Sequence, residues 1–345
     1  MSQLVKHDRA VSPPRGSILS VSDLGAVETL KVAREATLLR SEPLHNGHSG
    51  SLVVALMMNR SLRTRLGLAR ACVSTGAQFL ELQPECIYPP AVRTAESPYK
   101  NESIADIVRV VNLHASCFAV RAYGPSSLVP RGGGDDMLKQ IAATATVPVL
   151  NLESDSAHPI QALADLATIT SLGTATSKHV VVAWAYSPAP KPIAVPSSFV
   201  MAAAASGARL TIVSPPEFRL PARVTRDARE WALAAGGSLT ETTDLDGISD
   251  ADVLYMKSWL TNEAQDRGHG EIAGRYAQWR ATDRLLDELA PDAFYMHCLP
   301  ADRGYEVDDT VIDGKRSLVW TQVRMRREVT HILLRRALAE TTHDD

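Results

Sequence analysis

The chain has 345 residues, of which 45% are hydrophobic and 22% charged, and Lys+Arg 36 against Asp+Glu 39 gives a formal net charge of -3. A near-neutral balance with no long run of one sign argues against nucleic-acid and membrane-surface partners and favours a small molecule. This length exceeds the size that one hydrophobic core usually serves, so two domains of roughly 150 residues each are expected.

Apolar segments of strand length alternate with helix-length periodic segments in the first half of the chain. Strands are expected at residues 51–58, 78–82, 117–123 and 147–152, and helices at 65–76, 103–115 and 135–145. Buried strands that alternate with helices are typical of βαβ units in a parallel sheet.

The same alternation resumes at residue 179. Strands are expected at 179–186, 209–215, 252–259, 293–299 and 317–322, and helices at 197–207, 225–237 and 276–289. A helix over 158–173 is expected to join the two halves, and a helix over 326–340 to pack across the first one. The predicted fold class is therefore α/β, with two doubly wound parallel-sheet lobes joined by a helix.

The cysteines and the apolar runs bear on the compartment. The four cysteines Cys72, Cys86, Cys117 and Cys298 are far apart and form no CxxC pair, which argues against a zinc site and against a disulfide scaffold. No apolar run approaches the roughly 18 residues of a membrane span. The first thirty residues carry charges and prolines in place of an apolar signal core, so a cytoplasmic protein is expected.

Two hydroxyl residues and two arginines are concentrated where the first strand gives way to a helix. Ser61 and Thr64 fall at the start of that helix, where backbone N–H groups lack partners and the helix dipole is positive. Arg63 and Arg65 can each grip phosphate oxygens in pairs. This stretch predicts a phosphoryl-binding site, with an ordinary N-cap beside solvated arginines as the alternative.

Other polar residues follow predicted strands, which is where ligands collect in an open α/β sheet. Arg121 ends the third strand, His158 and Gln161 open the joining helix on one face, and Cys298 ends a later strand. Each has an ordinary alternative when taken alone: a surface ion pair, a capping histidine or a buried thiol.

In order and context these segments resemble the aspartate/ornithine carbamoyltransferases, and the resemblance runs from about residue 20 to about residue 338. It rests on SLRTR at 61–65, HPIQALAD at 158–165, KSW at 257–259, MHCLP at 296–300 and EVDD at 306–309. NLES, WAYSPAPKP and KSW are similar to the N-acetylornithine and N-succinylornithine carbamoyltransferase branch and its relatives of unsettled substrate. The resemblance implies transfer of a carbamoyl group from carbamoyl phosphate to an amino group of an amino acid, with release of phosphate and with no cofactor or metal.

The resemblance also assigns the residues of the donor site. The phosphate would be held by Ser61, the main chain of Leu62, Arg63, Thr64 and Arg65. The carbonyl would be polarised by Thr64, Arg121 and His158, so that Arg63, Arg121 and His158 are the expected catalytic residues. The carbamoyl NH₂ would be received by Gln161 and the main chain of Cys298 and Leu299, and Arg326 would add a contact. Lys100, in SPYKNES, resembles a lysine that aspartate enzymes take from a neighbouring subunit, which implies a homotrimer with sites at subunit interfaces.

The acceptor side departs from the ornithine enzymes, which carry Asp two residues before a Trp and then SMG. Here Lys257 precedes Ser258 and Trp259 and no SMG follows, so plain ornithine is disfavoured. Lys257 is expected to face a carboxylate of the acceptor, and Asp302 and Glu153 to face an ammonium or a second amine, with a surface lysine as the alternative for Lys257. An ornithine derivative or another diamino acid is expected, in arginine-related or specialised metabolism.

The resemblance divides the chain into a carbamoyl-phosphate-binding domain, 1–152 completed by 326–345, and an acceptor-binding domain, 153–325. In the acetylornithine branch a proline-rich loop closes a shallow knot, and here Pro188, Pro190, Pro192 and Pro196 would stiffen that loop or a plain surface connection.

Two rival functions remain. A nucleotide-dependent enzyme is disfavoured because no GxGxxG follows a predicted strand and no GxxxxGK[ST] occurs. The altered acceptor segment leaves room for a catalytically idle homologue that binds carbamoyl phosphate as a regulator.

Overall fold

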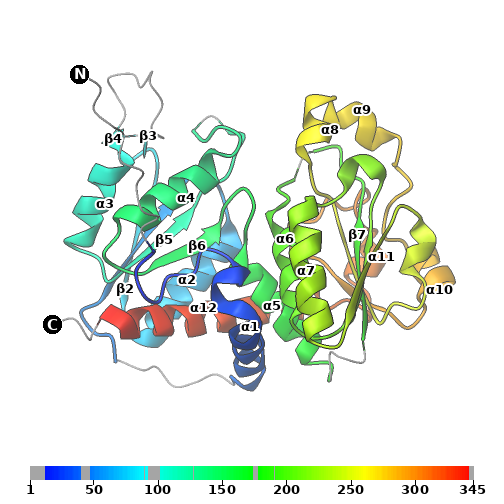
Figure 1. Ribbon diagram of the computed structural model, residues 1–345, viewed down its shortest axis with the longest axis horizontal. Helices are drawn as coiled ribbons and strands as arrows, with labels where there is room; N and C mark the ends of the chain where they lie inside the picture. The colour runs from blue at the N-terminus through cyan, green and yellow to red at the C-terminus, as the bar shows by residue number, and fades with distance from the viewer. Residues whose placement is uncertain are drawn as a thin grey trace.

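The computed structural model describes residues 12–39, 47–88, 90–91, 102–126, 128–173, 178–189 and 191–341. These residues form two α/β lobes that lie side by side, each built on its own parallel sheet (Figure 1). The predicted fold class is confirmed. No helix within these ranges is long and apolar enough to cross a membrane.

The first lobe holds a four-stranded sheet in the order β2-β1-β5-β6. Its strands are β1 (Leu52–Met57), β2 (Gln78–Leu82), β5 (Cys117–Arg121) and β6 (Val149–Glu153). The helices α2 (Leu62–Thr75), α3 (Ile104–Asn112) and α4 (Gly133–Thr144) connect them. β5 and β6 are buried along their whole length, as expected for parallel strands covered by helices on both faces. The short strands β3 (Pro90–Ala91) and β4 (Glu102–Ser103) pair separately.

The second lobe holds a five-stranded sheet in the order β11-β10-β7-β8-β9. Its strands are β7 (His179–Trp184), β8 (Arg209–Val213), β9 (Ser238–Thr242), β10 (Val253–Lys257) and β11 (Phe294–Met296). The α-helices are α6 (Ala194–Ala204), α7 (Ala222–Ala234), α8 (Asn262–Asp266), α9 (His269–Gly274), α10 (Asp283–Leu289) and α11 (Asp309–Ile312), with 3₁₀ turns at η2 (Pro216–Phe218) and η3 (Leu245–Ile248).

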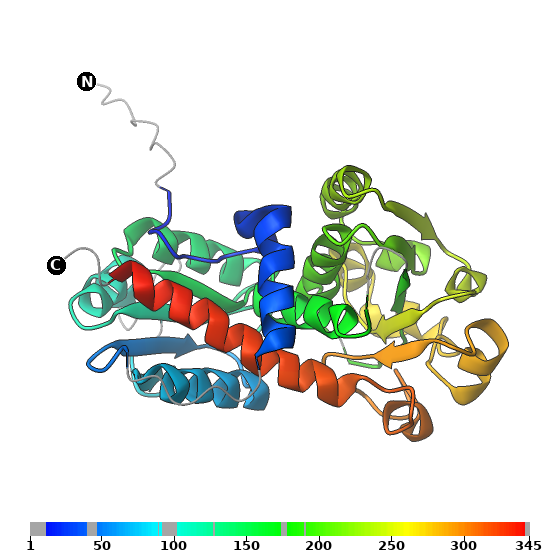
Figure 2. The same cartoon turned by 90° about the horizontal axis from the view of Figure 1, so that it is seen from below.

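Three helices connect the lobes. α5 (Pro159–Thr170) follows the last strand of the first sheet and packs against α1 (Val21–Leu38), α6 and α12 (Val319–Thr341). α5 is buried from Pro159 to Ile169, so it serves as core for both lobes. α12 runs beneath the first lobe and crosses α1 (Figure 2), and it packs against α2 and α5, which confirms the predicted placement of this helix.

Two predicted elements are wrong. Residues 317–322 do not form a strand: Ser317 makes one isolated bridge with Tyr295, and the chain enters α12 at Val319. The helix predicted over 276–289 begins only at Asp283, where the Thr282 side chain accepts a hydrogen bond from the Leu285 N–H and caps it. The residues before it are held otherwise, since the Trp279 carbonyl accepts from the Tyr186 N–H at 2.7 Å.

Candidate active site

A cavity of about 290 Å³ lies between the lobes, where strands of both sheets end. The first lobe lines it with Ser61, Arg63, Arg121, Tyr123 and Glu153. The joining helices α5 and α12 contribute His158, Gln161 and Arg326. The second lobe lines it mainly with Lys191, Lys257, Cys298, Leu299 and Asp302.

The N-terminus of α2 forms one end of this cavity. Ser61 is the N-cap; its Oγ accepts from the Thr64 N–H at 3.3 Å and donates to Thr64 Oγ1 at 2.8 Å. Arg63 lines the cavity, its buried Nε has no hydrogen-bond partner among the described residues, and burial lowers its pKa. The Leu62 side chain is exposed, which leaves the main chain as the part of this residue that is near the donor site. A half-buried guanidinium without a carboxylate partner, at a helix N-terminus, is suited to an anion.

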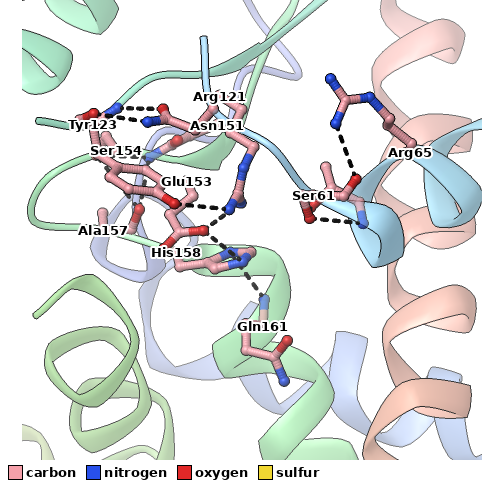
Figure 3. Close-up of polar contacts among 12 residues, drawn as sticks. Ser61, Arg65, Arg121, Tyr123, Asn151, Glu153, Ser154, Ala157, His158 and Gln161 are labelled. Carbon is pink, nitrogen blue, oxygen red and sulfur yellow. Dashed lines mark hydrogen bonds and ion pairs between the residues drawn. The ribbon is translucent and has the colours of Figure 1, made fainter. Parts of the chain in front are cut away.

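Arg65 does not lie in the cavity, and the prediction that it holds phosphate is corrected. Its Nη2 and Nε donate to Glu81 at 2.7 and 2.9 Å, and this carboxylate raises its pKa. Figure 3 shows Arg65 on the far side of Ser61 from Arg121 and His158. Residues two apart in a helix point about 200° from each other, so Arg63 and Arg65 cannot face the same ligand.

A buried ion pair, Arg121 with Glu153, lines the cavity, and His158 lies beside it. Arg121 ends β5, Glu153 ends β6, and the register of the sheet pairs the two residues, so that Arg121 Nη1 donates to Glu153 Oε2 (Figure 3). His158 Nε2 lies 3.7 Å from the same oxygen. The Arg121 guanidinium also lies 5.2 Å from the centre of the Tyr123 ring. Glu153 lines the cavity as predicted, but its carboxylate is already paired and is not free for an ammonium.

His158 is held as a neutral imidazole. It caps α5, where its Nδ1 accepts from the Gln161 N–H at 3.4 Å. Burial, and then the positive charges of Arg326, Arg121 and Arg63, lower its pKa well below the usual value. Its Nε2 lies 3.7 Å from Glu153 Oε2 and 3.2 Å from Nη2 of Arg326, which can only donate, so Nε2 either accepts from Arg326 or, when it carries the ring proton, leaves that nitrogen of Arg326 to donate to Thr64. With the proton on Nε2, the ring can donate one hydrogen bond into the cavity.

Arg326 lies on α12 and is hydrogen-bonded to one residue of α5 and one residue of α2. Its Nη1 donates to Gln161 Oε1 at 2.9 Å, and its Nη2 donates to Thr64 Oγ1 at 2.7 Å. Burial lowers the pKa of Arg326 to about 10, so the side chain remains charged at neutral pH. The structure thus brings Ser61, Arg63, Thr64, Arg121, His158, Gln161 and Arg326 together.

Residues 298–300 form another wall of the cavity. The Leu299 backbone has φ 55, and its N–H donates to His297 Nδ1 at 3.0 Å. The His297 N–H in turn donates to Gln322 Oε1 at 2.9 Å. Burial raises the pKa of Cys298, so this residue is a neutral thiol at neutral pH. Cys298 and Leu299 both line the cavity, as predicted.

Lys257 is the cation of the acceptor end. It ends β10, is buried, and its Nζ donates to the Ser258 carbonyl at 2.5 Å. No carboxylate of the described residues lies within ion-pair distance of this nitrogen. Neither of the next two residues lines the cavity: the backbone N–H of Ser258 donates to Glu306 Oε1 at 2.7 Å, and the Trp259 ring N–H donates to the Phe218 carbonyl at 2.6 Å. The predicted acceptor contacts of Ser258 and Trp259 are therefore corrected to structural ones in the second lobe.

Asp302 lines the cavity but is also paired, which corrects its predicted role toward an ammonium. Its Oδ2 accepts from Ser187 Oγ at 2.5 Å and lies 3.0 Å from Lys191 Nζ. Lys191 lies 2.8 Å from Glu306 Oε2, and this same oxygen accepts from the Asp302 N–H at 2.7 Å. Although burial opposes ionisation of Glu306, His297, Lys257 and Lys191 hold its pKa well below the usual range.

Sequence reasoning missed three residues of the site: Tyr123, Lys191 and Glu306. A lysine between prolines in PAPKP was the available signal for Lys191, and EVDD contained Glu306. Lys100 and Pro190 lie outside the described residues.

Comparison with known proteins agrees with this geometry. Residues 17–171 match the family model "Aspartate/ornithine carbamoyltransferase, carbamoyl-P binding domain", and residues 193–336 match the "Asp/Orn binding domain" of the same family. The chain is 31% identical to the ornithine carbamoyltransferase of Parafrankia sp. (strain EAN1pec) over 326 residues, which are 94% of this chain and 95% of that protein. It is 30% identical to the ornithine carbamoyltransferase of Methanoculleus marisnigri over 93% of this chain and 96% of that one.

Solved structures give the same family. Acetylornithine transcarbamylase complexed with acetylcitrulline superposes with a TM-score of 0.84 at 26% sequence identity, covering 94% of this chain and 98% of that chain. A variant of N-acetyl-L-ornithine transcarbamylase complexed with carbamyl phosphate and N-succinyl-L-norvaline superposes equally well, with a TM-score of 0.84 and 26% identity over the same shares of both chains. Two matched domains, full-length relatives and a cavity between the lobes together establish that this chain belongs to the aspartate/ornithine carbamoyltransferase family and is a carbamoyltransferase that acts on an amino acid.

Proposed function

We propose that this carbamoyltransferase uses an ornithine-type acceptor whose α-nitrogen is acylated. The observation that carries the proposal is the charge balance of the cavity among the described residues. Two cations that line the cavity, the half-buried Arg63 and the buried Lys257, have no carboxylate within ion-pair distance there, whereas both carboxylates of the wall, Glu153 and Asp302, are paired. The site therefore suits a substrate pair that brings anions and no free ammonium besides the reacting amine.

The donor would bind at the Arg63 end. Its phosphate would lie against Arg63, the Ser61 and Thr64 hydroxyls and the first N–H groups of α2, including that of Leu62. These donors neutralise the leaving group as the bond from carbon to the bridging oxygen breaks. Phosphate leaves more easily because the charge it gains is already matched by a fixed cation.

The carbamoyl carbonyl would lie between Arg121 and His158. When the neutral amine attacks carbon, negative charge grows on the carbonyl oxygen, and the Arg121 guanidinium and the Nε2–H of His158 can stabilise it. The carbamoyl NH₂ would donate to Gln161 Oε1 and to the main-chain oxygens of Cys298 and Leu299. These contacts hold the planar group in place for the attack.

The acceptor would place its carboxylate at Lys257 in the second lobe. A zwitterionic α-ammonium would find both nearby carboxylates occupied, and it would be desolvated beside Lys191 and Lys257 without compensation. An acylated α-nitrogen is neutral and avoids this cost. Acetylcitrulline and N-succinyl-L-norvaline, the ligands named for two structural neighbours, have this same feature, which supports the proposal.

Three further proposals concern the domains, the compartment and the oligomeric state. We propose that residues 1–152 with 326–345 bind carbamoyl phosphate and residues 153–325 bind the acceptor. A cytoplasmic protein is supported by four cysteines that are all free thiols. A homotrimer is supported by an exposed apolar groove beside the reaction cavity.

An acceptor panel tests the proposal. The protein is incubated with carbamoyl phosphate and ornithine, N-acetylornithine, N-succinylornithine, diaminopropionate, putrescine or aspartate, and the ureido product and released phosphate are measured. We expect an acylated ornithine to give a kcat/KM at least about 100-fold above that of ornithine, since an unpaired buried charge costs a few kcal/mol. A preference for plain ornithine would refute the acylated acceptor, and binding of carbamoyl phosphate without turnover of any amine would indicate an idle homologue.

Replacement of Lys257 tests the acceptor end by itself. Lys257→Met removes the charge and keeps most of the length of the side chain, so the acceptor KM is expected to rise roughly 10- to 100-fold while the dissociation constant of carbamoyl phosphate stays within about twofold. Lys178→Met, which removes a partly exposed lysine of the same lobe, is the matched control and should change neither constant. An unchanged acceptor KM in Lys257→Met would place Lys257 outside the acceptor site.

A further inference from the structure

Asp165 is a buried carboxyl group beneath the donor site. It lies one helical turn after Gln161 in α5, where every other residue from Pro159 to Ile169 is also buried. One oxygen, Oδ1, accepts hydrogen bonds from Gln161 Nε2 and from Gln322 Nε2, both at 2.7 Å. Burying a carboxyl group in a helix core is costly, so its retention there calls for a functional explanation.

The two hydrogen bonds of Gln161 decide which way its amide points. The two ends of a primary amide have nearly the same shape, so packing alone scarcely distinguishes the oxygen from the NH₂ group. An ionised carboxylate oxygen only accepts, and Asp165 therefore takes the NH₂ end. Arg326 only donates, and its Nη1 takes Oε1 at 2.9 Å. An amide oxygen has two lone pairs, so Oε1 can accept one more hydrogen bond from a ligand in the cavity.

Gln322 extends the same arrangement to the segment that begins at His297. Its Nε2 donates to Asp165, so its Oε1 is the end that accepts from the His297 N–H at 2.9 Å. His297 precedes Cys298 and Leu299, which line the cavity. One carboxyl oxygen thus orients two amides, that of Gln161, which lines the cavity, and that of Gln322, which holds the His297 N–H.

We infer that Asp165 is a positioning residue that makes the site selective for the amide of carbamoyl phosphate. By fixing Gln161, it ensures that an acceptor, not a donor, faces the carbamoyl NH₂, and through Gln322 it holds the segment that begins at His297. This inference rests on the proposed binding of that NH₂ by Gln161 and by the main chain of residues 298–299. Asp165 does not touch the phosphate, so its effect is confined to the carbamoyl half of the donor.

The role does not require a negative charge on Asp165. Burial raises the pKa of Asp165 to about 7, while the hydrogen bonds from Gln322 and Gln161 and the charge of Arg326 act in the opposite direction. Tyr255 is the other titratable neighbour, and burial followed by the charge of Asp165 raises its pKa. Oδ1 can accept from both amides whether or not the other oxygen carries a proton. A neutral side chain that keeps this oxygen should therefore suffice.

The test compares two ligands that differ only in the carbamoyl group. Dissociation constants of carbamoyl phosphate and of inorganic phosphate are measured by titration calorimetry for the wild type, Asp165→Leu and Asp165→Asn. In Asp165→Leu, which keeps the branching at Cγ but has no acceptor, we expect carbamoyl phosphate to bind roughly 10- to 100-fold more weakly and phosphate to change less than about twofold. Asp165→Asn keeps one oxygen for both amides and should retain the wild-type ratio within about threefold.

Controls separate this role from a merely structural one. Thr168→Val removes a hydroxyl from a buried residue of the same helix, and should leave both constants unchanged. An equal weakening of both ligands in Asp165→Leu would overturn the inference. If Asp165→Leu does not fold, Asp165→Asn still decides, because a selective loss of carbamoyl phosphate there would also overturn it. A wild type that binds phosphate but not carbamoyl phosphate would refute the proposed function, and the inference with it.

Discussion

Arg63 and Arg65 lie two positions apart in the first turn of α2 and have different partners. Arg63 lines the reaction cavity without a carboxylate partner among the described residues, whereas Arg65 donates three hydrogen bonds to Glu81. The helix geometry separates their functions, since one side chain can turn toward the ligand only if the other turns away. A pair of identical residues in one motif thus provides its own control.

The two arginines are expected to respond differently to the same substitution. Arg63→Met should lower kcat/KM for carbamoyl phosphate roughly a thousandfold, because a half-buried cation that matches the leaving phosphate is lost. Arg65→Met should lower it less than about tenfold and cost about 1 kcal/mol of stability, the usual range for a partly exposed ion pair. Steady-state kinetics and thermal melting measure the two effects. Similar kinetic losses in both variants would contradict the separation.

The sequence placed the residues of the donor end more reliably than those of the acceptor end, for a physical reason. Ser61, Arg63, Arg121, His158 and Gln161 all follow strands or open helices, and parallel strands bring such positions to one edge. The availability of Glu153 and Asp302 could not be predicted, because it depends on whether another residue has already paired with them. The sheet register places Arg121 beside Glu153, and the packing of loops places Lys191 within 3.0 Å of Asp302.

The N-terminus of α4 supports the segment that carries Arg121 and Tyr123. The two backbones approach closely at Gly134, where a Cβ atom would lie 2.0 Å from the Ala122 carbonyl oxygen and 2.8 Å from Asp155 Oδ2. Asp155 accepts from the Gly124 N–H at 2.8 Å and from the Asp135 N–H at 3.0 Å, which joins the loop to the helix. Gly134 is therefore required by the space available to it.

Gly134→Ala is expected to destabilise the protein by about 2 kcal/mol or more and to lower kcat, because α4 or the loop at Tyr123 must move apart. Gly270→Ala is the matched control: this glycine also lies in a helix, α9, but a Cβ there would meet nothing within 4 Å. The control should be neutral or slightly stabilising, by up to about 1 kcal/mol. Urea denaturation and steady-state kinetics measure both variants, and equal stability of the two would show that the close approach at Gly134 is relieved without cost.

Periodicity predicted the elements where it was unambiguous and failed where it was not. The buried strands β1, β5 and β7 and the helix α5 were found because apolar runs of strand and helix length differ clearly. The short apolar run at 317–322 is compatible with a strand or with the start of a helix. The isolated bridge between Ser317 and Tyr295 is a long-range contact that periodicity does not predict. β9, with the sequence SLTET, was missed because only Leu239 of its five residues is buried.

An apolar groove lies beside the reaction cavity, on the outside of the first lobe. A groove of about 710 Å³ is lined by Leu62, Leu66, Trp320 and Val323, and it shares Arg63, Leu299 and Arg326 with the cavity. Trp320 is 66% exposed and Leu62 is 70% exposed. Contiguous exposed apolar surface of this kind marks an interaction site, and its continuity with the cavity fits a second copy that completes the active site.

Trp320→Glu is expected to dissociate the proposed homotrimer and to remove most of the activity, because a charge in a buried interface costs several kcal/mol. Leu233→Glu is the matched control, since Leu233 is 65% exposed on α7 of the other lobe and lines no part of this groove. Light scattering coupled to gel filtration should show a trimer for the wild type and the control and a monomer for Trp320→Glu. Kinetics over a dilution series should show a specific activity that falls with the trimer. A wild type that remains fully active as a monomer would exclude a contribution of a neighbouring subunit to the site and would leave the exposed groove without the occupant proposed for it.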